Sequence, residues 1–219
     1  MGGVNVEIWS DLVCPFCYIG KRNWEAALER FEHRESVDVR WRSFQLDPIA
    51  PRVSDVDLHD YLGAKYGGGR EAGKAMNDRV ARAAAAVGLR FELDTARRGN
   101  TLDAHRVVHL AREHGVEEAA LERLFAAYFT ESEPIADPGT LARLALDVGL
   151  DAAEVRSMLA GDGYGDAVRA EMREGMQLGI NAVPCFVFER RFGVSGAQPP
   201  DVLLGALQRA WAERSEAVA

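Results

Sequence analysis

Two cysteines separated by two residues, Cys14-Pro15-Phe16-Cys17, lie where a predicted strand ends and a predicted helix begins. Before this motif, apolar and polar residues alternate over 4–9, which is typical of a strand. After it, apolar residues recur at helical spacing as far as Phe31. Pro15 suits the first helical position, because its missing N–H would have no partner there. The motif therefore predicts a strand, a sharp turn and a helix at the start of the chain.

The rest of the sequence contains two further kinds of pattern. A long stretch has helical periodicity throughout, with one amphipathic helix expected to begin at Met76, and strand character then returns. The elements expected after the motif are a strand over 37–43, helices through most of 50–178, strands over 185–188 and 191–194, and a helix over 199–211. The chain thus has the order βαβ, helical block, ββα.

This order predicts an α/β fold, a small βαβ…ββα unit interrupted by a large inserted all-helical domain. With 219 residues, 47% hydrophobic and 27% charged, the chain can bury a core and is short for a long multidomain assembly. Insertion is tolerated at exposed connections. We expect residues 1–48 and 179–219 to form the α/β domain, and residues 49–178 the inserted domain.

Charge and hydropathy restrict the partners and the compartment. The formal net charge is −8, the wrong sign for covering a phosphate backbone, so no nucleic-acid partner and no anionic membrane surface is expected. The first ten residues carry no basic region, and no run of about 18 apolar residues occurs. A cytoplasmic protein is expected. Its three cysteines are too few for a disulfide framework and indicate reactive, metal-binding or buried thiols.

The position of the two motif cysteines favours redox chemistry. Cys14 would lie at the N-terminal end of a helix, where unpaired N–H groups and the positive end of the helix dipole favour a thiolate. Cys17 would follow on the same helix face, close enough for a modest adjustment to join the two sulfurs. Cys14 would attack a disulfide and Cys17 would resolve the intermediate.

Two alternatives remain for these cysteines, half of a zinc site or two inert buried thiols. A structural zinc site needs two further Cys or His ligands at matching spacing, and no second such pair follows. His105 and His109 are four residues apart, but they fall within a predicted helix of the inserted block. We expect neither a metal nor a cofactor.

Val183-Pro184 precedes an apolar strand and is the second informative pair. A cis bond there would expose backbone groups to a bound peptide. Taken alone, however, the residues favour an ordinary trans proline at a strand start, because only about 5–6% of such bonds are cis.

Three segments together resemble a known family. They are Ser10-Asp11-Leu12-Val13-Cys14-Pro15-Phe16-Cys17-Tyr18-Ile19-Gly20-Lys21, Asn100-Thr101 with Ala104-His105-Arg106, and Val183-Pro184-Cys185-Phe186-Val187-Phe188 with Gly193-Val194-Ser195-Gly196-Ala197-Gln198. In these segments, which span nearly the whole chain, the sequence resembles the cytosolic DsbA-like oxidoreductases of the FrnE type. The resemblance implies a thioredoxin-like fold split by a helical domain, and thiol–disulfide exchange as the activity.

The resemblance also implies roles for individual residues. It implies Cys14 as the nucleophile, Cys17 as the resolving thiol and Pro184 as a cis proline opposite the motif. Asp11 resembles the acid that precedes the motif in this family. DsbA itself has a His between its cysteines where this chain has Phe16, so we expect a less oxidising couple.

The expected partners are protein or small-molecule thiols and disulfides, glutathione among them. Substrate contacts are expected from Pro15, Phe16, Val183 and Cys185. Cys185 is either a small buried hydrophobic residue at a strand start or a third thiol that traps Cys14 or completes a soft-metal site.

Two other functions compete with disulfide exchange. The chromene-carboxylate isomerases and kappa-class transferases are similar in having inserted helices, which suggests a glutathione-dependent isomerase or transferase. Cys17 argues against this reading, since a bound glutathione thiolate needs no resolving partner. A thiol-rich module that binds a soft metal or docks a partner would be non-enzymatic, and the zinc content of the purified protein separates it from the enzymes.

Overall fold

The computed structural model describes residues 3–216, which divide into two compact units. The first unit comprises Met1–Phe44 and Glu171–Ala219, and the second comprises Gln45–Ala170. The prediction that residues 49–178 are a separate inserted domain stays a prediction.

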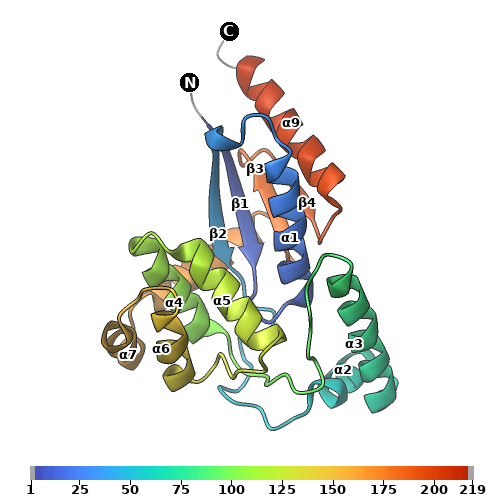
Figure 1. Ribbon diagram of the computed structural model, residues 1–219, viewed down its shortest axis with the longest axis vertical. Helices are drawn as coiled ribbons and strands as arrows, with labels where there is room; N and C mark the ends of the chain where they lie inside the picture. The colour runs from blue at the N-terminus through green and yellow to red at the C-terminus, as the bar shows by residue number, and fades with distance from the viewer. Residues whose placement is uncertain (1–2, 217–219) are drawn as a thin grey trace. The chain divides into compact units, whose positions relative to one another are not determined.

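The first unit contains a four-stranded sheet in the order β2-β1-β3-β4 (Figure 1). The strands are β1 (Val4–Ser10), β2 (Val37–Ser43), β3 (Cys185–Phe188) and β4 (Phe192–Ser195). β1 runs parallel to β2, while β3 is antiparallel to both β1 and β4. A right-handed helical crossover is the usual way to join parallel neighbours, and α1 (Pro15–Glu29) followed by the short 3-10 helix η1 (Arg34–Ser36) connects β1 to β2.

Helices cover both faces of this sheet. On one face α1 packs beside α9 (Pro200–Glu216), and the Trp24 ring of α1 lies 5.9 Å from that of Phe186 and 6.2 Å from that of Phe188. On the other face the Trp9 indole N–H donates to the Glu171 carbonyl oxygen at 3.0 Å, on helix α8 (Gly165–Gln177). Because both faces are covered, β1 is buried continuously from Val6 to Ser10.

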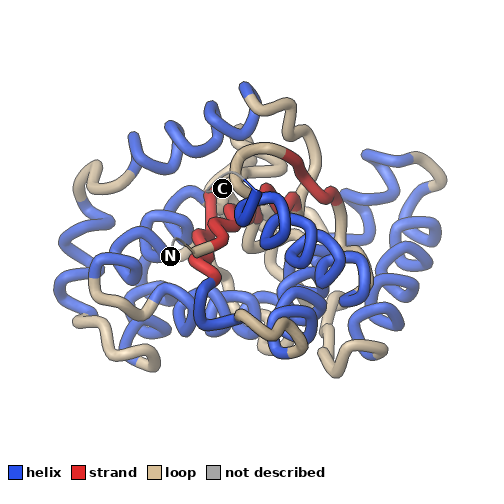
Figure 2. The backbone as a smooth tube through the Cα atoms, turned by 90° about the horizontal axis from the view of Figure 1, so that it is seen from above, coloured by secondary structure: helices blue, strands red, loops and turns tan. Residues whose placement is uncertain are grey.

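The second unit is helical, whereas the strands, drawn red in Figure 2, all belong to the first unit. Its helices are α2 (Leu58–Tyr66), α3 (Gly69–Ala85), α4 (Leu102–Glu113), α5 (Glu117–Phe129), α6 (Pro138–Leu146), α7 (Ala152–Ala160) and the first residues of α8. The expected start of one helix at Met76 was wrong, because α3 begins at Gly69. Its first two turns carry mostly exposed side chains, and Arg70 pairs there with Asp57 and Asp60, so no apolar stripe marks them.

Apolar side chains from α5 and α6 lie at the centre of the second unit, where Phe125, Leu141 and Leu144 are at most 1% exposed. The buried Arg106 of α4 donates hydrogen bonds to the carbonyl oxygens of Met158 and Gly161, both at 2.6 Å. A buried guanidinium is tolerated when its donors are satisfied in this way.

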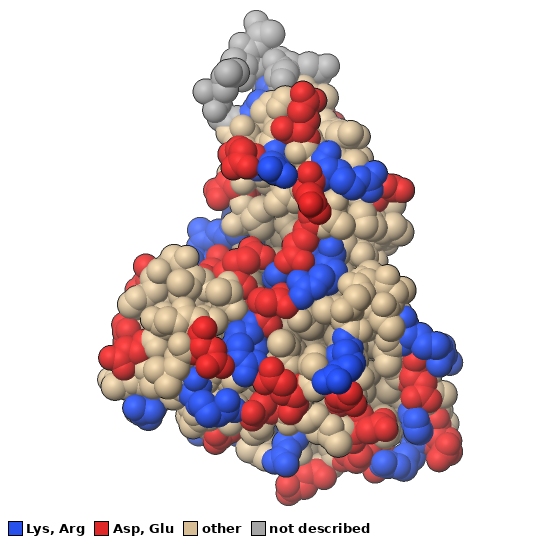
Figure 3. All heavy atoms as spheres, in the orientation of Figure 1, with Lys and Arg blue, Asp and Glu red and all other residues tan. Residues whose placement is uncertain are grey.

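The charged residues form no single-sign patch on the face drawn in Figure 3, where Lys and Arg side chains are interspersed with Asp and Glu. Many of them pair, as Arg123 does with Glu131 and Asp147 at 2.8 Å each. Within residues 3–216, no helix combines the length and the apolar character that a membrane span requires.

Candidate active site

The N-terminus of α1 presents the two motif cysteines. Cys14 is the N-cap residue with extended backbone angles, φ −87° and ψ 112°, and Pro15 begins the helix as predicted. The Cys14 N–H donates to the Asp11 carbonyl oxygen at 3.0 Å, and the Cys17 N–H donates to the Cys14 carbonyl oxygen at 3.0 Å. These two bonds set the turn that places Cys14 at the end of the helix.

The two motif thiols are buried beneath a more exposed rim. Cys14 is 4% exposed and Cys17 is fully buried, whereas the intervening Phe16 is 47% exposed and Pro15 is half-buried. All the cysteines are free thiols. An incoming disulfide would therefore meet Phe16 and Pro15 first, then Cys14, and it would reach Cys17 last.

The Cys17 thiol is held in its protonated form. Burial raises the pKa of Cys17 well above its ordinary value, and hydrogen bonding to Cys14 raises it further. The Ser10 hydroxyl and the Asp11 backbone N–H act in the opposite direction, because both favour the ionised form of the Cys17 sulfur. Cys17 therefore keeps its proton and donates a hydrogen bond to the Cys14 sulfur.

The segment before β3 lies against the motif. The Cys14 thiol donates to the Val183 carbonyl oxygen at 3.5 Å, and both groups are buried. The Val183–Pro184 peptide bond is cis, as the family resemblance implied. The Pro184 carbonyl oxygen accepts a hydrogen bond from the Gly196 N–H at 2.8 Å, which holds the proline from the β4 side.

Two residues of α1 that the sequence analysis assigned no role contact this segment and the loop after β4. A Cβ added to Gly20 would lie 2.8 Å from Pro184 Cγ and 3.5 Å from Phe186 Cζ, so only glycine permits this approach. Asn23 donates to the Gln198 carbonyl oxygen at 3.0 Å from a buried position. A glycine within a predicted helix was the available signal for Gly20. Asn23 carries no such signal.

Cys185 does not join the motif cysteines. Phe186 faces α1, and successive side chains of a strand point to opposite faces, so Cys185 faces α8. Its register partner on β1 is Trp9, whose indole binds the α8 backbone. Burial raises the pKa of the Cys185 thiol.

No metal-binding cluster supports the three-thiol hypothesis. Within residues 3–216, no group of three or more Cys, His, Asp or Glu side chains is arranged to hold a metal ion. His105 and His109 are both buried in α4. The idea that Cys185 completes a soft-metal site with Cys14 and Cys17 was wrong, because the strand turns its side chain to the other face.

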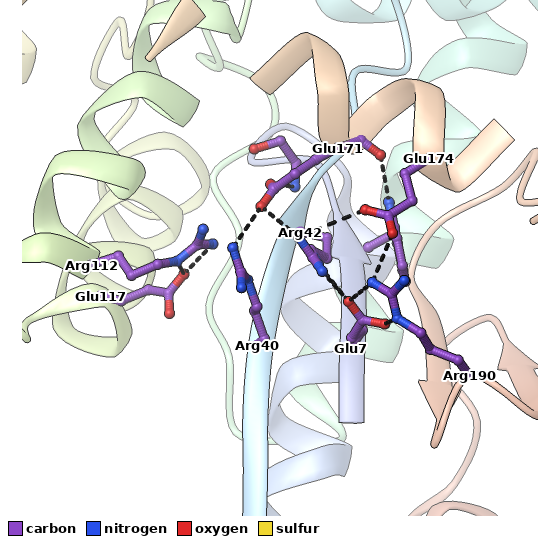
Figure 4. A network of polar contacts seen from close by, with 10 residues as sticks. Glu7, Arg40, Arg42, Arg112, Glu117, Glu171, Glu174 and Arg190 are labelled. Carbon is purple, nitrogen blue, oxygen red and sulfur yellow. Dashed lines mark hydrogen bonds and ion pairs between the residues drawn. The ribbon is translucent and has the colours of Figure 1, made fainter. Parts of the chain in front are cut away.

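An ion-pair network fixes α8 on that other face (Figure 4). Glu7 of β1 accepts from Arg42 of β2 and from Arg190 beyond β3, each through Nε at 2.7 Å. Glu171 of α8 accepts from the Ser43 N–H at 2.7 Å and from Arg42 Nη1 at 3.2 Å. Both carboxylates are buried, and the network links β1, β2 and the turn after β3 to one helix.

Comparisons with known proteins agree with this arrangement. The family model of the DSBA-like thioredoxin domain matches residues 5–208. The chain belongs to the DsbA-like thioredoxin family. It therefore has the expected thioredoxin-like α/β fold with a helical insertion, and it is an enzyme of a thiol–disulfide oxidoreductase family.

Two proteins are similar to this chain over nearly their full lengths. A probable DsbA oxidoreductase from Streptomyces coelicolor is 44% identical, with a TM-score of 0.92 over 96% of this chain and 91% of that one. The uncharacterised protein YwbO of Bacillus subtilis is 28% identical over 93% of this chain and 96% of its own length.

Two more distant structures share the fold. The cytosolic disulfide reductase DsbM from Pseudomonas aeruginosa, solved with GSH, is 20% identical with a TM-score of 0.66 over 95% of this chain and 99% of that one. A 2-hydroxychromene-2-carboxylate isomerase is 13% identical with a TM-score of 0.72 over 97% and 98%. The narrower FrnE-type assignment stays a prediction.

Proposed function

We propose that this protein catalyses thiol–disulfide exchange by cycling Cys14 and Cys17 between a dithiol and a disulfide. The observation that carries the proposal is the pairing at the start of α1, where the fully buried, protonated Cys17 donates to Cys14 at the helix N-cap. Burial keeps Cys17 protonated beside a Cys14 that lies at the helix N-cap, which distinguishes a resolving sulfur from an attacking one.

The cycle has two exchanges. The Cys14 thiolate attacks one sulfur of a substrate disulfide, forms a mixed disulfide and expels the other sulfur as a thiolate that takes up a proton. Cys17 then loses its proton and attacks Cys14, so the Cys14–Cys17 bond forms and the second substrate thiol leaves. The substrate is reduced by two electrons and the motif is oxidised by two. The reverse sequence oxidises a dithiol substrate.

Substrate contacts in this proposal come from the rim and from the segment before β3. Pro15 and Phe16 offer apolar surface ahead of Cys14, and the Val183 carbonyl oxygen, next to the cis Pro184, accepts a hydrogen bond from the thiol itself. We leave the Cys185 side chain out of this set, because its strand position turns it toward α8.

Proteins or small molecules with thiols and disulfides are the proposed partners, with glutathione among them. The disulfide reductase DsbM, solved with GSH, supports this class of partner. We place the cycle in the cytoplasm, as the resemblance to cytosolic oxidoreductases and the cytosolic DsbM favour.

Reduction of insulin disulfides, with glutathione as the electron source, tests the proposal in four proteins. Wild type and Cys185→Ser turn over, whereas Cys14→Ser and Cys17→Ser lose turnover. Turnover that survives in Cys17→Ser contradicts the dithiol cycle and supports the glutathione-dependent isomerase or transferase. Turnover that survives in Cys14→Ser contradicts the assignment of the nucleophile.

A further inference from the structure

Ser10 is the last residue of β1, and its hydroxyl is buried beside the resolving thiol. The residue is 3% exposed, and its hydroxyl oxygen, Oγ, has no hydrogen-bond partner within residues 3–216. The Cys17 thiol is the titratable group that this hydroxyl influences, since Ser10 favours the ionised form of Cys17. Burying a hydroxyl whose O–H has no acceptor costs free energy, so each such group in a folded protein calls for an explanation.

The reaction itself would supply the missing acceptor. A neutral thiol is a weak hydrogen-bond acceptor, whereas a thiolate is anionic and accepts strongly. Cys17 becomes anionic only when it resolves the mixed disulfide. The hydroxyl is therefore placed for a charge that develops during the second exchange.

The surroundings of Cys17 change between the two exchanges. In the dithiol form, burial and the hydrogen bond to Cys14 both raise the pKa of Cys17, which keeps its proton in place. Once Cys14 is joined to substrate, its sulfur no longer carries charge, and that second contribution disappears. The Ser10 hydroxyl and the Asp11 N–H, which both favour the ionised form of Cys17, remain in place.

We propose that the Ser10 hydroxyl donates a hydrogen bond to the Cys17 thiolate as Cys17 attacks the mixed disulfide, and that Ser10 is thus a catalytic residue of the resolving step. The inference rests on the proposed dithiol cycle. The proton of Cys17 passes to the departing substrate thiolate, and Ser10 keeps its own. Other ionisable groups around Cys17 are Cys14, Asp11 before the helix and Lys21 one turn along α1.

The test separates the two exchanges with dithiobis(nitrobenzoate), which releases one coloured thiolate when Cys14 attacks and a second when Cys17 resolves. Ser10→Ala keeps the rate of the first release and slows the second about 3- to 10-fold. Loss of a hydrogen bond to a charged group lowers the thiolate population, and the higher nucleophilicity of the remaining thiolate offsets part of that loss. In Ser10→Ala, the rate of the second release also begins to rise at a higher pH than in wild type.

The matched control is Ser195→Ala, which removes an exposed hydroxyl on β4 and leaves both releases unchanged. If Ser10→Ala does not fold, Ser10→Thr is compared with Ser10→Val, because the two side chains have the same shape and only threonine keeps a hydroxyl. The second release should be faster in Ser10→Thr than in Ser10→Val. Equal second releases with and without the hydroxyl overturn the role of Ser10.

The same experiment reports separately on the proposed function. If wild type gives no second release, or if Cys17→Ser keeps it, the dithiol cycle is wrong, whatever Ser10 does. If wild type gives both releases, Cys17→Ser gives only the first and the Ser10 variants match wild type, then the cycle stands and the role of Ser10 alone is overturned.

Discussion

The Cys14 sulfur donates a hydrogen bond to the Val183 carbonyl oxygen at 3.5 Å, across 169 positions of sequence. This contact brings the start of α1 against the segment that precedes β3. Geometry at a reacting sulfur is sensitive to small displacements, since a misplacement of about 1 Å can cost roughly 100-fold in rate. Residues that set this approach should therefore affect exchange as well as stability.

Gly20→Ala tests that expectation. The added Cβ would lie 2.8 Å from Pro184 Cγ, and a proline ring cannot rotate away, so the segment must move from Cys14. We expect kcat/KM for exchange with a peptide disulfide to fall roughly 10-fold. We expect the free energy of unfolding, from urea titration, to fall by about 1–2 kcal/mol because overpacking exceeds the gain in helix propensity.

Gly205→Ala is the control for this substitution. Gly205 lies in α9 and a Cβ there would have no neighbour within 4 Å. The variant should gain up to about 1 kcal/mol of stability and keep wild-type exchange kinetics. Unchanged kinetics in Gly20→Ala would show that the approach of Pro184 does not govern the reaction.

Alkylation should distinguish the three thiols. Burial and the hydrogen bond to Cys14 raise the pKa of Cys17, and burial raises that of Cys185, so both stay protonated at neutral pH and react faster only as the pH rises toward those values. Brief iodoacetamide treatment of the reduced native protein at neutral pH should modify Cys14 alone, as mapped by peptide mass spectrometry. Comparable early labelling of Cys17 or Cys185 would contradict these pKa directions.

Glu171→Ala should be destabilising. Its buried carboxylate accepts from the Ser43 N–H and from Arg42, and its removal leaves that N–H without its acceptor, while Arg42 keeps Glu7 as a partner. We expect a loss of about 1–3 kcal/mol in the free energy of unfolding. Asp201→Ala removes the exposed partner of Arg30 and should cost less than about 1 kcal/mol. Similar losses of unfolding free energy in the two variants would show that burial of the network adds nothing to stability.

Glu7 should make stability depend on acidic pH. Burial raises the pKa of this carboxyl, but hydrogen bonds from Arg190 and Arg42 outweigh burial, so its net pKa is lowered from 4.5. Its contribution is complete above pH 4.5 and is lost as the pH falls through the lower folded-state value. Unfolding free energies of wild type and Glu7→Gln should therefore converge as the pH drops below that range. A gap that stays constant on acidification would contradict the assignment.

Sequence periodicity predicted the order of elements because each strand and helix here is specified locally. The alternation before Ser10, the proline after Cys14 and the apolar run at 185–188 each mark an element without reference to the rest of the chain. The start of α3 was missed because its first turns are solvated and carry no apolar stripe.

The finer structure of the site depends on contacts between distant positions. The cis proline was expected only through family resemblance, since the local residues favour trans. The direction of Cys185 follows from its register with Trp9, 176 positions away, and the place of Ser10 beside Cys17 follows from how α1 packs on β1. Local patterns do not encode such pairings.

The most direct test of the dithiol cycle is capture of its intermediate. Cys17→Ser, reduced and mixed with a peptide containing one disulfide, should accumulate a mixed disulfide, and peptide mapping should place it on Cys14. Wild type under the same conditions should instead yield the Cys14–Cys17 disulfide and free peptide thiols. An adduct on Cys185, or no adduct on any thiol, would contradict the account.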